Sequence, residues 1–134
     1  MKLIFTRHRH ILTVLPASQF LRTSQWPAYN NTDSRSKGKW PLDEFQAVAL
    51  IEVTGPSGKD DGKFGPYFLK FLVAGRSGLG IHSGREGIEC GDGLGRKGPE
   101  WATMGCIRTT SAAMHCIAAA WALDEAATLT VEEG

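Results

Sequence analysis

Thr103-Met104-Gly105-Cys106-Ile107-Arg108-Thr109-Thr110 is the stretch on which the predicted fold and the predicted site both depend, because it sets a cysteine after a glycine just before an obvious helix. Alanine dominates residues 111–126, and the threonines and serine at 109–111 are suited to an N-cap. A thiol at the start of a helix meets unpaired backbone N–H groups and the positive end of the helix dipole, which both favour the thiolate. The stretch therefore predicts Cys106 as a nucleophile.

Short runs of β-branched and aromatic residues lie on both sides of this helix, separated by glycine and proline. Such runs favour strands. We expect strands within residues 3–15 (one or two strands), 45–53 (a buried strand), 67–73, 79–83 and 127–131. A helix over residues 42–49 stays open, because a short apolar run does not decide the type of element. The sequence thus predicts a mainly β fold that carries one packed helix.

Three other segments are rich in turn residues. Residues 25–41 are polar and without period, which predicts a long ordered surface loop in which two tryptophans pack. Residues 54–62 predict a turn or exposed loop. Residues 84–98 contain six glycines and predict a flap, whose charged side chains are available to a charged substrate (Arg85, Glu86, Asp92, Arg96 and Lys97). This segment lacks the Gly-Lys-Ser/Thr sequence of a phosphate-binding loop.

Composition limits the function further. The chain has 134 residues, 42% of them hydrophobic and 22% charged, with a formal charge of +1, so nothing in the overall charge predicts a nucleic-acid partner. We see no repeat and no domain boundary, and we expect one domain over residues 1–134. Charged residues at 6–10 divide the apolar N-terminal run, which predicts neither a signal peptide nor a membrane span. The chain then stays in the cell, is exported by a route that the sequence does not show, or has lost a leader.

Three cysteines are too few for a disulfide scaffold, and their odd number leaves at least one free thiol. Cys90, Cys106, His115 and Cys116 lack the close spacing of zinc ligands, and neighbours on a helix point about 100° apart. We therefore expect no metal and no cofactor. Cys116 is expected in the core, Cys90 is a thiol of unknown use, and the histidines at 8 and 10 are expected on the surface of one strand.

His82 is the best candidate for the base that a cysteine nucleophile needs. It follows an apolar pair at the end of a predicted strand and precedes Ser83-Gly84, so its imidazole could face an open site. The sequence separation says nothing about distance in space, because such partners meet only through the fold. On residue types alone, Cys106 as a small buried hydrophobic residue remains the alternative.

Two motifs resemble those of the L,D-transpeptidase (YkuD-type) catalytic domain family. Ile81-His82-Ser83-Gly84 is similar to its histidine motif, and Thr103 to Arg108 is similar to its Ser/Thr-x-Gly-Cys-apolar-Arg motif. Residues 30–45 resemble the loop that leads into a Thr-Pro-x-Gly-x-Phe element, so the similarity extends from about residue 26 to 108. The resemblance implies an L,D-transpeptidase-like β-sandwich or barrel, with one packed helix after the catalytic cysteine, over residues 1–134.

The resemblance also implies roles for single residues. Cys106 would be the nucleophile and His82 the general base, with the Ser83 carbonyl orienting the imidazole. The N–H groups of Gly105 and Cys106 would hold the oxyanion. Arg108 would bind a substrate carboxylate or brace the loop.

Thr103 would hold the turn through its hydroxyl. Met104 stands where many members of the family carry a histidine that lines the donor site, which puts the substrate preference in question. Leu42-Asp43 stands where the family often has a glycine, and this difference weakens only the resemblance of residues 30–45.

The implied reaction is attack on the third, L-centred residue of a peptidoglycan tetrapeptide stem, with loss of the terminal D-alanine. Transfer to an amine, to a D-amino acid or to water would give crosslinking, exchange or L,D-carboxypeptidase activity. The implied site of action is the periplasm or cell envelope, and an injected antibacterial effector with an immunity or delivery partner is a minority alternative. Two rival hypotheses are a cysteine hydrolase of other peptides or amides and a non-catalytic peptidoglycan-binding module.

Overall fold

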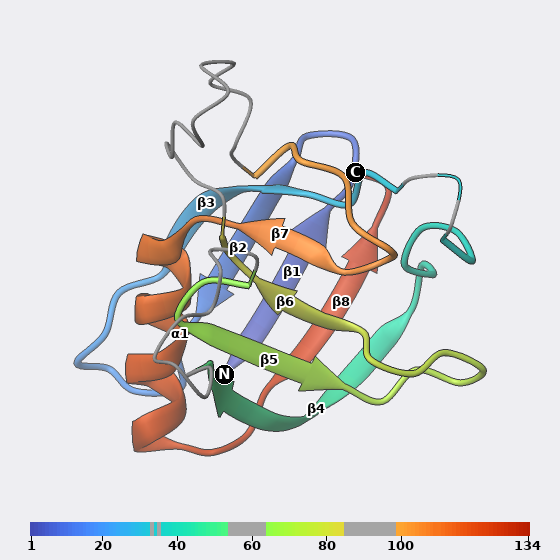
Figure 1. The fold of residues 1–134 in the computed structure, drawn as a ribbon. Helices are drawn as coiled ribbons and strands as arrows, with labels where there is room; N and C mark the ends of the chain where they lie inside the picture. Colours follow the sequence, from blue (N-terminus) through green and yellow to red (C-terminus); the bar gives the residue numbers. More distant parts are fainter. Residues whose placement is uncertain (33, 35, 54–63, 85–98) are drawn as a thin grey trace, which may run out of the picture.

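The structure, a computed structural model, describes residues 1–32, 34, 36–53, 64–84 and 99–134. These residues form eight strands and one helix, coloured along the chain in Figure 1. In order they are β1 Lys2–Thr6, β2 Ile11–Leu15, β3 Ser24–Tyr29, β4 Glu44–Glu52, β5 Tyr67–Phe71, β6 Gly80–His82, β7 Ile107–Thr109, α1 Ser111–Leu123 and β8 Thr128–Glu132. The prediction of a mainly β fold with one packed helix is confirmed.

The strands form a closed barrel in the order β1-β2-β3-β7-β6-β5-β4-β8. Strand β8 runs parallel to β1 and pairs with it along its whole length, from Lys2↔Thr128 to Thr6↔Glu132, so the two lie side by side in Figure 1. Strands β6 and β7 are also parallel, and the other neighbours are antiparallel. Closure leaves no long unpaired edge on the sheet.

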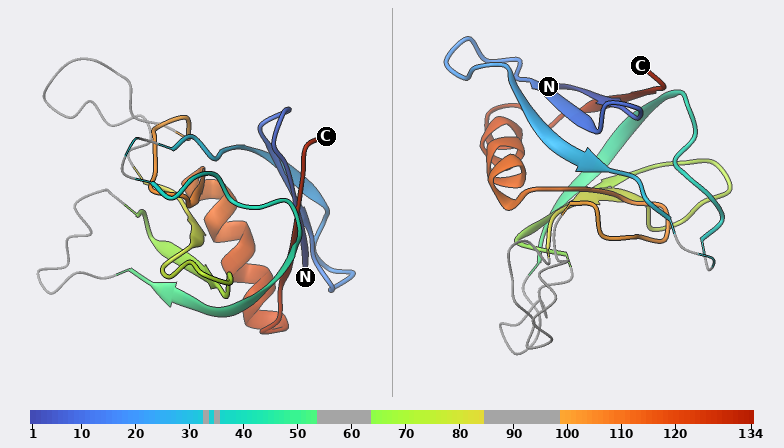
Figure 2. Two further views of the ribbon diagram at one scale, coloured as in Figure 1. Left: turned by 90° about the vertical axis from the view of Figure 1, so that its right-hand side faces the viewer. Right: turned by 90° about the horizontal axis from the view of Figure 1, so that it is seen from above.

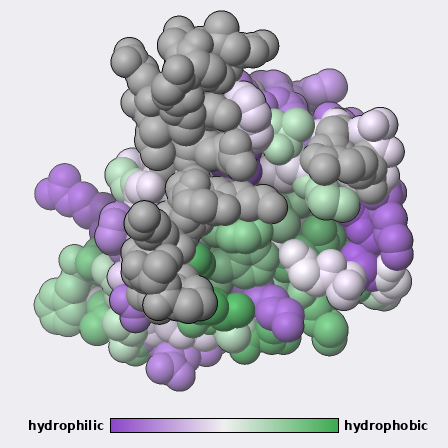
Figure 3. Space-filling view, viewed as in Figure 1, coloured by the Kyte–Doolittle hydropathy of each residue, from purple (hydrophilic) through white to green (hydrophobic). Residues whose placement is uncertain are grey.

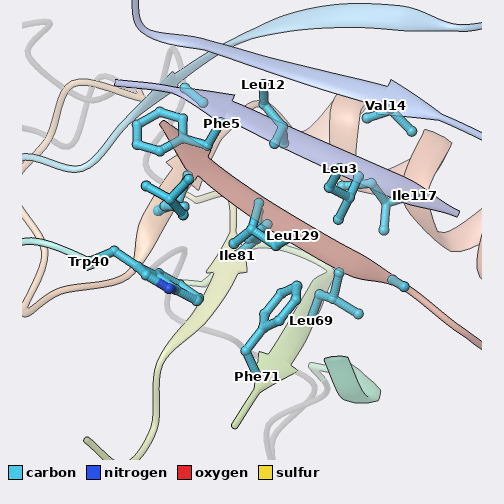
Figure 4. Packing of buried hydrophobic residues seen from close by; sticks show 14 of the residues in the cluster. Leu3, Phe5, Leu12, Val14, Trp40, Leu69, Phe71, Ile81, Ile117 and Leu129 are labelled. Atoms are coloured by element: carbon cyan, nitrogen blue, oxygen red, sulfur yellow. The ribbon is translucent and has the colours of Figure 1, made fainter. Parts of the chain in front are cut away.

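Alternating side chains of β1, β2 and β8 fill the barrel. Leu3 and Phe5, Leu12 and Val14, and Leu129 and Val131 face inward and are almost completely buried. They form one cluster with Leu69, Phe71 and Ile81, shown in Figure 4. Each side chain of this size contributes about 1.5–3 kcal/mol when fully buried. The period-2 pattern of these strands therefore accounts for the core.

Helix α1 lies beside the ends of strands β5, β6 and β7 (Figures 1 and 2). Its N-cap is Thr110, whose hydroxyl accepts a hydrogen bond of 3.0 Å from the Ala113 N–H. Met114 and Ile117, three residues apart, point into the core. The outer side of the helix also carries alanines, and Figure 3 shows a hydrophobic surface at its lower left, where α1 and the loop between β2 and β3 lie in Figure 1.

The predicted surface loop at residues 25–41 is wrong in its first part, which forms β3. Ser24 to Pro27 pair with β2, and the next two residues pair with β7. Pro27 stands where the strand changes partner, so its missing N–H does not interrupt a continuous ladder. In the rest of the segment Trp40 is fully buried against Phe45 and Phe71, with ring centroids 5.8 and 5.4 Å away, so this tryptophan packs as predicted.

Several other expectations need correction. The strand predicted over residues 45–53 is confirmed as β4, and the helix that stayed open does not form, but the strand is only partly buried, since Val48 and Ile51 are 50% and 44% exposed. His8 and His10 lie in the turn between β1 and β2, where His10 adopts a φ of 54° and stacks on Tyr29. Helix α1 ends at residue 123, three residues before its predicted end.

Two predicted segments lie outside the described residues. The loop at 54–62 is one of them, and the flap at 84–98, with Cys90, is the other except for its first glycine. Strand β7 was not predicted, because a run of three residues carries too little pattern to be recognised.

We expect Leu129→Ala to reduce the free energy of unfolding by about 3 kcal/mol, because it leaves a cavity among fully buried side chains. The matched control is Leu72→Ala, which removes the same atoms from a side chain that is 75% exposed and should change stability by less than about 0.5 kcal/mol. Urea unfolding followed by circular dichroism measures both. Equal effects of the two substitutions would contradict the assignment of Leu129 to the core.

Candidate active site

A pocket of about 630 Å³ opens at the junction of β6, β7 and the loops before them. Five of the residues predicted for the site line it, namely His82, Thr103, Met104, Cys106 and Arg108. The other two, Ser83 and Gly105, are their neighbours in the chain and are buried. The structure therefore brings together two motifs that are 24 residues apart in sequence.

Parallel pairing of β6 with β7 sets the geometry of the pocket. Ile81 pairs with Ile107, and His82 pairs with Arg108. Paired residues point to the same side of a sheet, so the two isoleucines enter the core while His82 and Arg108 share the opposite face. Cys106 precedes Arg108 by two residues and lines the same pocket. The His82 imidazole, at the end of β6, and the Cys106 sulfur, just before β7, therefore line the same pocket.

The imidazole of His82 is held on three sides. Its Nδ1 lies 2.8 Å from the Ser83 carbonyl oxygen, the contact that the resemblance implied. Phe68 stacks on the ring at 5.6 Å between centroids, and Phe64 meets it edge-on at 5.0 Å. Because a carbonyl oxygen only accepts hydrogen bonds, Nδ1 carries the proton in the neutral ring, and Nε2 carries the lone pair. His82 is therefore a fixed imidazole in the tautomer that a general base requires.

The turn before Cys106 is held by the Thr103 hydroxyl. This group donates to the Cys106 carbonyl at 2.6 Å and accepts from the Gly105 N–H at 3.2 Å. The Thr103 N–H in turn donates to the Asn31 carbonyl at 2.7 Å. The Gly105 N–H is thus already engaged, and it could reach an oxyanion only by giving up the Thr103 hydroxyl.

Asn30, to which sequence reasoning gave no role, supports the same turn from the core. Its Nδ2 donates to the carbonyls of Gly105 (2.8 Å) and Cys106 (3.0 Å), and its Oδ1 accepts from the Trp40 N–H (2.7 Å). The side chain is only 2% exposed. An asparagine after a strand usually signals a turn, so the sequence carries no mark of these distant partners.

The Cys106 thiol is 9% exposed, and its Sγ lies 3.6 Å from the Gly78 carbonyl oxygen. Burial raises the pKa of this thiol, while the Gly80 backbone N–H and the charges of Arg108 and Arg76 lower it to a lesser extent. Cys106 does not have the position at a helix terminus from which the sequence predicted a thiolate. Strand β7 separates Cys106 from the helix, which begins at residue 111.

Arg76 is a second residue of the pocket that sequence reasoning missed. It lies in the tight turn after β5, where its N–H bonds to the Val73 carbonyl, and its side chain reaches the carbonyls of Gly38 (2.9 Å) and Lys39 (3.4 Å). Gly105 has a φ of 128°, and a Cβ there would lie 2.3 Å from Arg76 Nη2. The glycine before the cysteine thus gives room to a guanidinium. Nothing in the sequence distinguishes this arginine from an ordinary turn residue.

The described residues hold no group of three His, Cys, Asp or Glu side chains that could bind a metal ion, and Cys90 lies outside them. Cys116 is a free, half-buried thiol, 3.6 Å from the Ser24 hydroxyl. It belongs to the margin of the core, as expected. In the part of the chain described, no helix is long and apolar enough to cross a membrane.

Comparison with protein-family models gives no match, and comparison with curated proteins gives no similar sequence. Solved structures with a similar fold include the following two. Bd1075 of Bdellovibrio bacteriovorus matches with a TM-score of 0.67 and 12% sequence identity, over 98% of this chain and 47% of that one. The L,D-transpeptidase of Xylanimonas cellulosilytica matches with a TM-score of 0.53 and 15% identity, over 97% of this chain and 59% of that one.

The chain therefore spans about half the length of these two proteins. At such low identity the likeness concerns the fold, and it supports the fold relationship to L,D-transpeptidase domains that the two motifs suggested.

We expect Asn30→Ala to lower the free energy of unfolding by about 3 kcal/mol, because it leaves the Gly105 carbonyl and the Trp40 N–H buried without this partner and leaves the Cys106 carbonyl with the Thr103 hydroxyl alone. Gln25→Ala is the matched control, since it removes an exposed amide bonded only to the Thr13 hydroxyl, and should change stability by less than about 0.5 kcal/mol. Urea unfolding measures both. If the two variants were equally stable, Asn30 would not hold the turn.

We expect the alkylation rate of Cys106 by iodoacetamide to be low at pH 7 and to rise with a midpoint above the ~8.5 of an exposed thiol. The reason is that only the thiolate reacts, and burial raises the pKa of Cys106. The measurement uses a variant with Cys90→Ala and Cys116→Ala, so that Cys106 alone reports, with a cysteine peptide as reference. A midpoint below 7 would instead show a preformed thiolate and imidazolium pair.

Proposed function

We propose that this chain is a cysteine acyltransferase that acts on peptidoglycan stem peptides, as a single catalytic domain over residues 1–134. The observation that carries the proposal is the meeting of Cys106 and His82 in one pocket, with Nδ1 of the imidazole bonded to the Ser83 carbonyl. The fold similarity to an L,D-transpeptidase supports the choice of substrate. Because peptidoglycan lies in the cell envelope, the proposed site of action is there.

In the proposed reaction Cys106 Sγ attacks the carbonyl carbon of the third, L-centred residue of a tetrapeptide stem. The thiol proton passes to Nε2 of His82 as the new C–S bond forms. Collapse of the tetrahedral intermediate breaks the C–N bond, and His82 returns the proton to the amine of the departing D-alanine. The product is a thioester at Cys106, which an amine, a D-amino acid or water then resolves.

The buried thiol favours concerted activation. Because the raised pKa keeps Cys106 neutral before substrate binds, His82 must accept the proton during attack. Arg76 and Arg108 already lower the pKa of the thiol by their charge, and the same charges would stabilise the negative charge that develops on sulfur and oxygen. The Cys106 N–H is the proposed oxyanion donor, since the Gly105 N–H is bonded to Thr103.

The proposal is tested by incubating the purified protein with disaccharide-tetrapeptides and following product masses. We expect loss of D-alanine, exchange of it, or a crosslinked dimer, and we expect Cys106→Ala to reduce the rate by at least about 10³-fold because it removes the proposed nucleophile. Cys116→Ala is the control and should retain wild-type rates, since Cys116 lies outside the pocket.

A well-folded wild-type protein that leaves all these stems unchanged would overturn the proposal. Turnover of casein, with no turnover of stems, would replace it by a cysteine hydrolase of ordinary peptides.

A further inference from the structure

Arg76 places a guanidinium beside the proposed nucleophile. Its Nη2 lies so close to Gly105 that a Cβ there would be 2.3 Å away, and Gly105 directly precedes Cys106. Arg76 and Cys106 line the same pocket, and the charge of Arg76 acts to lower the pKa of the thiol, so the guanidinium stands near the sulfur. The carbonyls of Gly38 and Lys39 hold it in this place.

The charge of Arg76 is not compensated within the described part of the chain. Its guanidinium donates to two neutral carbonyl oxygens, and no described carboxylate lies within ion-pair distance of it. Arginine has five N–H donors, of which these bonds use two. The side chain is half-buried and lines the pocket, so the remaining donors are accessible to a ligand.

The described lining of the pocket has one sign of charge. Lys37, Arg76 and Arg108 contribute cations, and among the described residues neither Asp nor Glu lines it. Such a pocket favours an anionic ligand, and a guanidinium matches the two oxygens of a carboxylate in particular. Arg108 is 3% exposed and donates to the Trp101 carbonyl. The half-buried guanidinium of Arg76 is therefore more accessible to a ligand than that of Arg108.

We propose that Arg76 determines specificity by binding the free α-carboxylate of the residue that the reaction expels. This inference rests on the proposed function. When a carbonyl carbon sits at the Cys106 sulfur, the carboxylate of the next residue lies one residue further on, and Arg76, beside Gly105 in the same pocket, is placed near it. The site would therefore select peptides that end one residue after the attacked bond, and would reject those in which that carboxylate is amidated or extended.

The test compares a tetrapeptide stem with a free C-terminus and the same stem as its C-terminal amide. In the wild type we expect kcat/KM for the acid to exceed that for the amide roughly 10- to 100-fold, the range of a charge-assisted hydrogen-bond pair. Because the charge of Arg76 also stabilises the developing negative charge, Arg76→Gln should slow both peptides, and it should slow the acid about 10- to 100-fold more than the amide, which removes the preference. Arg76→Lys should restore part of it, because it keeps the charge and loses the fork.

Arg22→Gln is the matched control, since it makes the same change at an exposed arginine outside the pocket, and should keep the wild-type preference. A wild type that converts acid and amide equally would overturn the role of Arg76 and leave the proposed function standing.

Calorimetric measurement of how tightly the acid and the amide bind to the Cys106→Ala variant tests the role of Arg76 independently of turnover. We expect the acid to bind at least 10-fold more tightly than the amide, and Arg76→Gln in the same background to abolish the difference. Equal affinity for the two peptides, or binding of neither, would refute the inference. Absence of turnover in the wild type, with the preference in binding retained, would refute the proposed function alone.

Discussion

The parallel pairing of β6 with β7 is the constraint on which the site depends. It sets His82 opposite Arg108 and sends Ile81 and Ile107 into the core, so the register that completes the barrel also fixes which side chains face the pocket. A slip of one residue would exchange the two faces, sending the histidine into the hydrophobic core and an isoleucine toward the pocket. Fold and site are therefore specified by the same hydrogen bonds, and the hydrophobic core enforces the geometry of the polar face.

The second constraint is the support of the turn before Cys106 from two directions. Thr103 closes the turn locally. Asn30, which follows β3 and is far away in sequence, donates to the carbonyls of Gly105 and Cys106 in the same turn. Together these bonds satisfy backbone groups that would be costly to bury unpaired. The result is a sulfur held on a rigid frame but withdrawn from water, so its reactivity depends on what enters the pocket more than on the resting protein.

Much of the fold was predictable from local pattern, and the site only in part. Runs of apolar residues predicted helix α1 and six of the strands, β1, β2, β4, β5, β6 and β8. Strand β3 was not predicted because Pro27 interrupts its pattern, and β7 was not predicted because three residues are too short to show one. Two motifs pointed to His82 and Cys106. Asn30 and Arg76 act through partners far away in sequence, at Gly105 and its neighbours, and such contacts have no period or spacing to reveal them.

Closure of the barrel by β1 and β8 has a consequence for folding. Residues 126 positions apart must pair, as the hydrogen bond between Thr6 and Glu132 illustrates. Such a contact stabilises the fold only after most of the chain between the two residues has lost conformational entropy. The core combines side chains of β1 and β2 with side chains from Leu69 onward, including those of β8, so the first half of the chain alone cannot complete it. We therefore expect the chain to fold slowly, in one cooperative step that needs nearly all of its length.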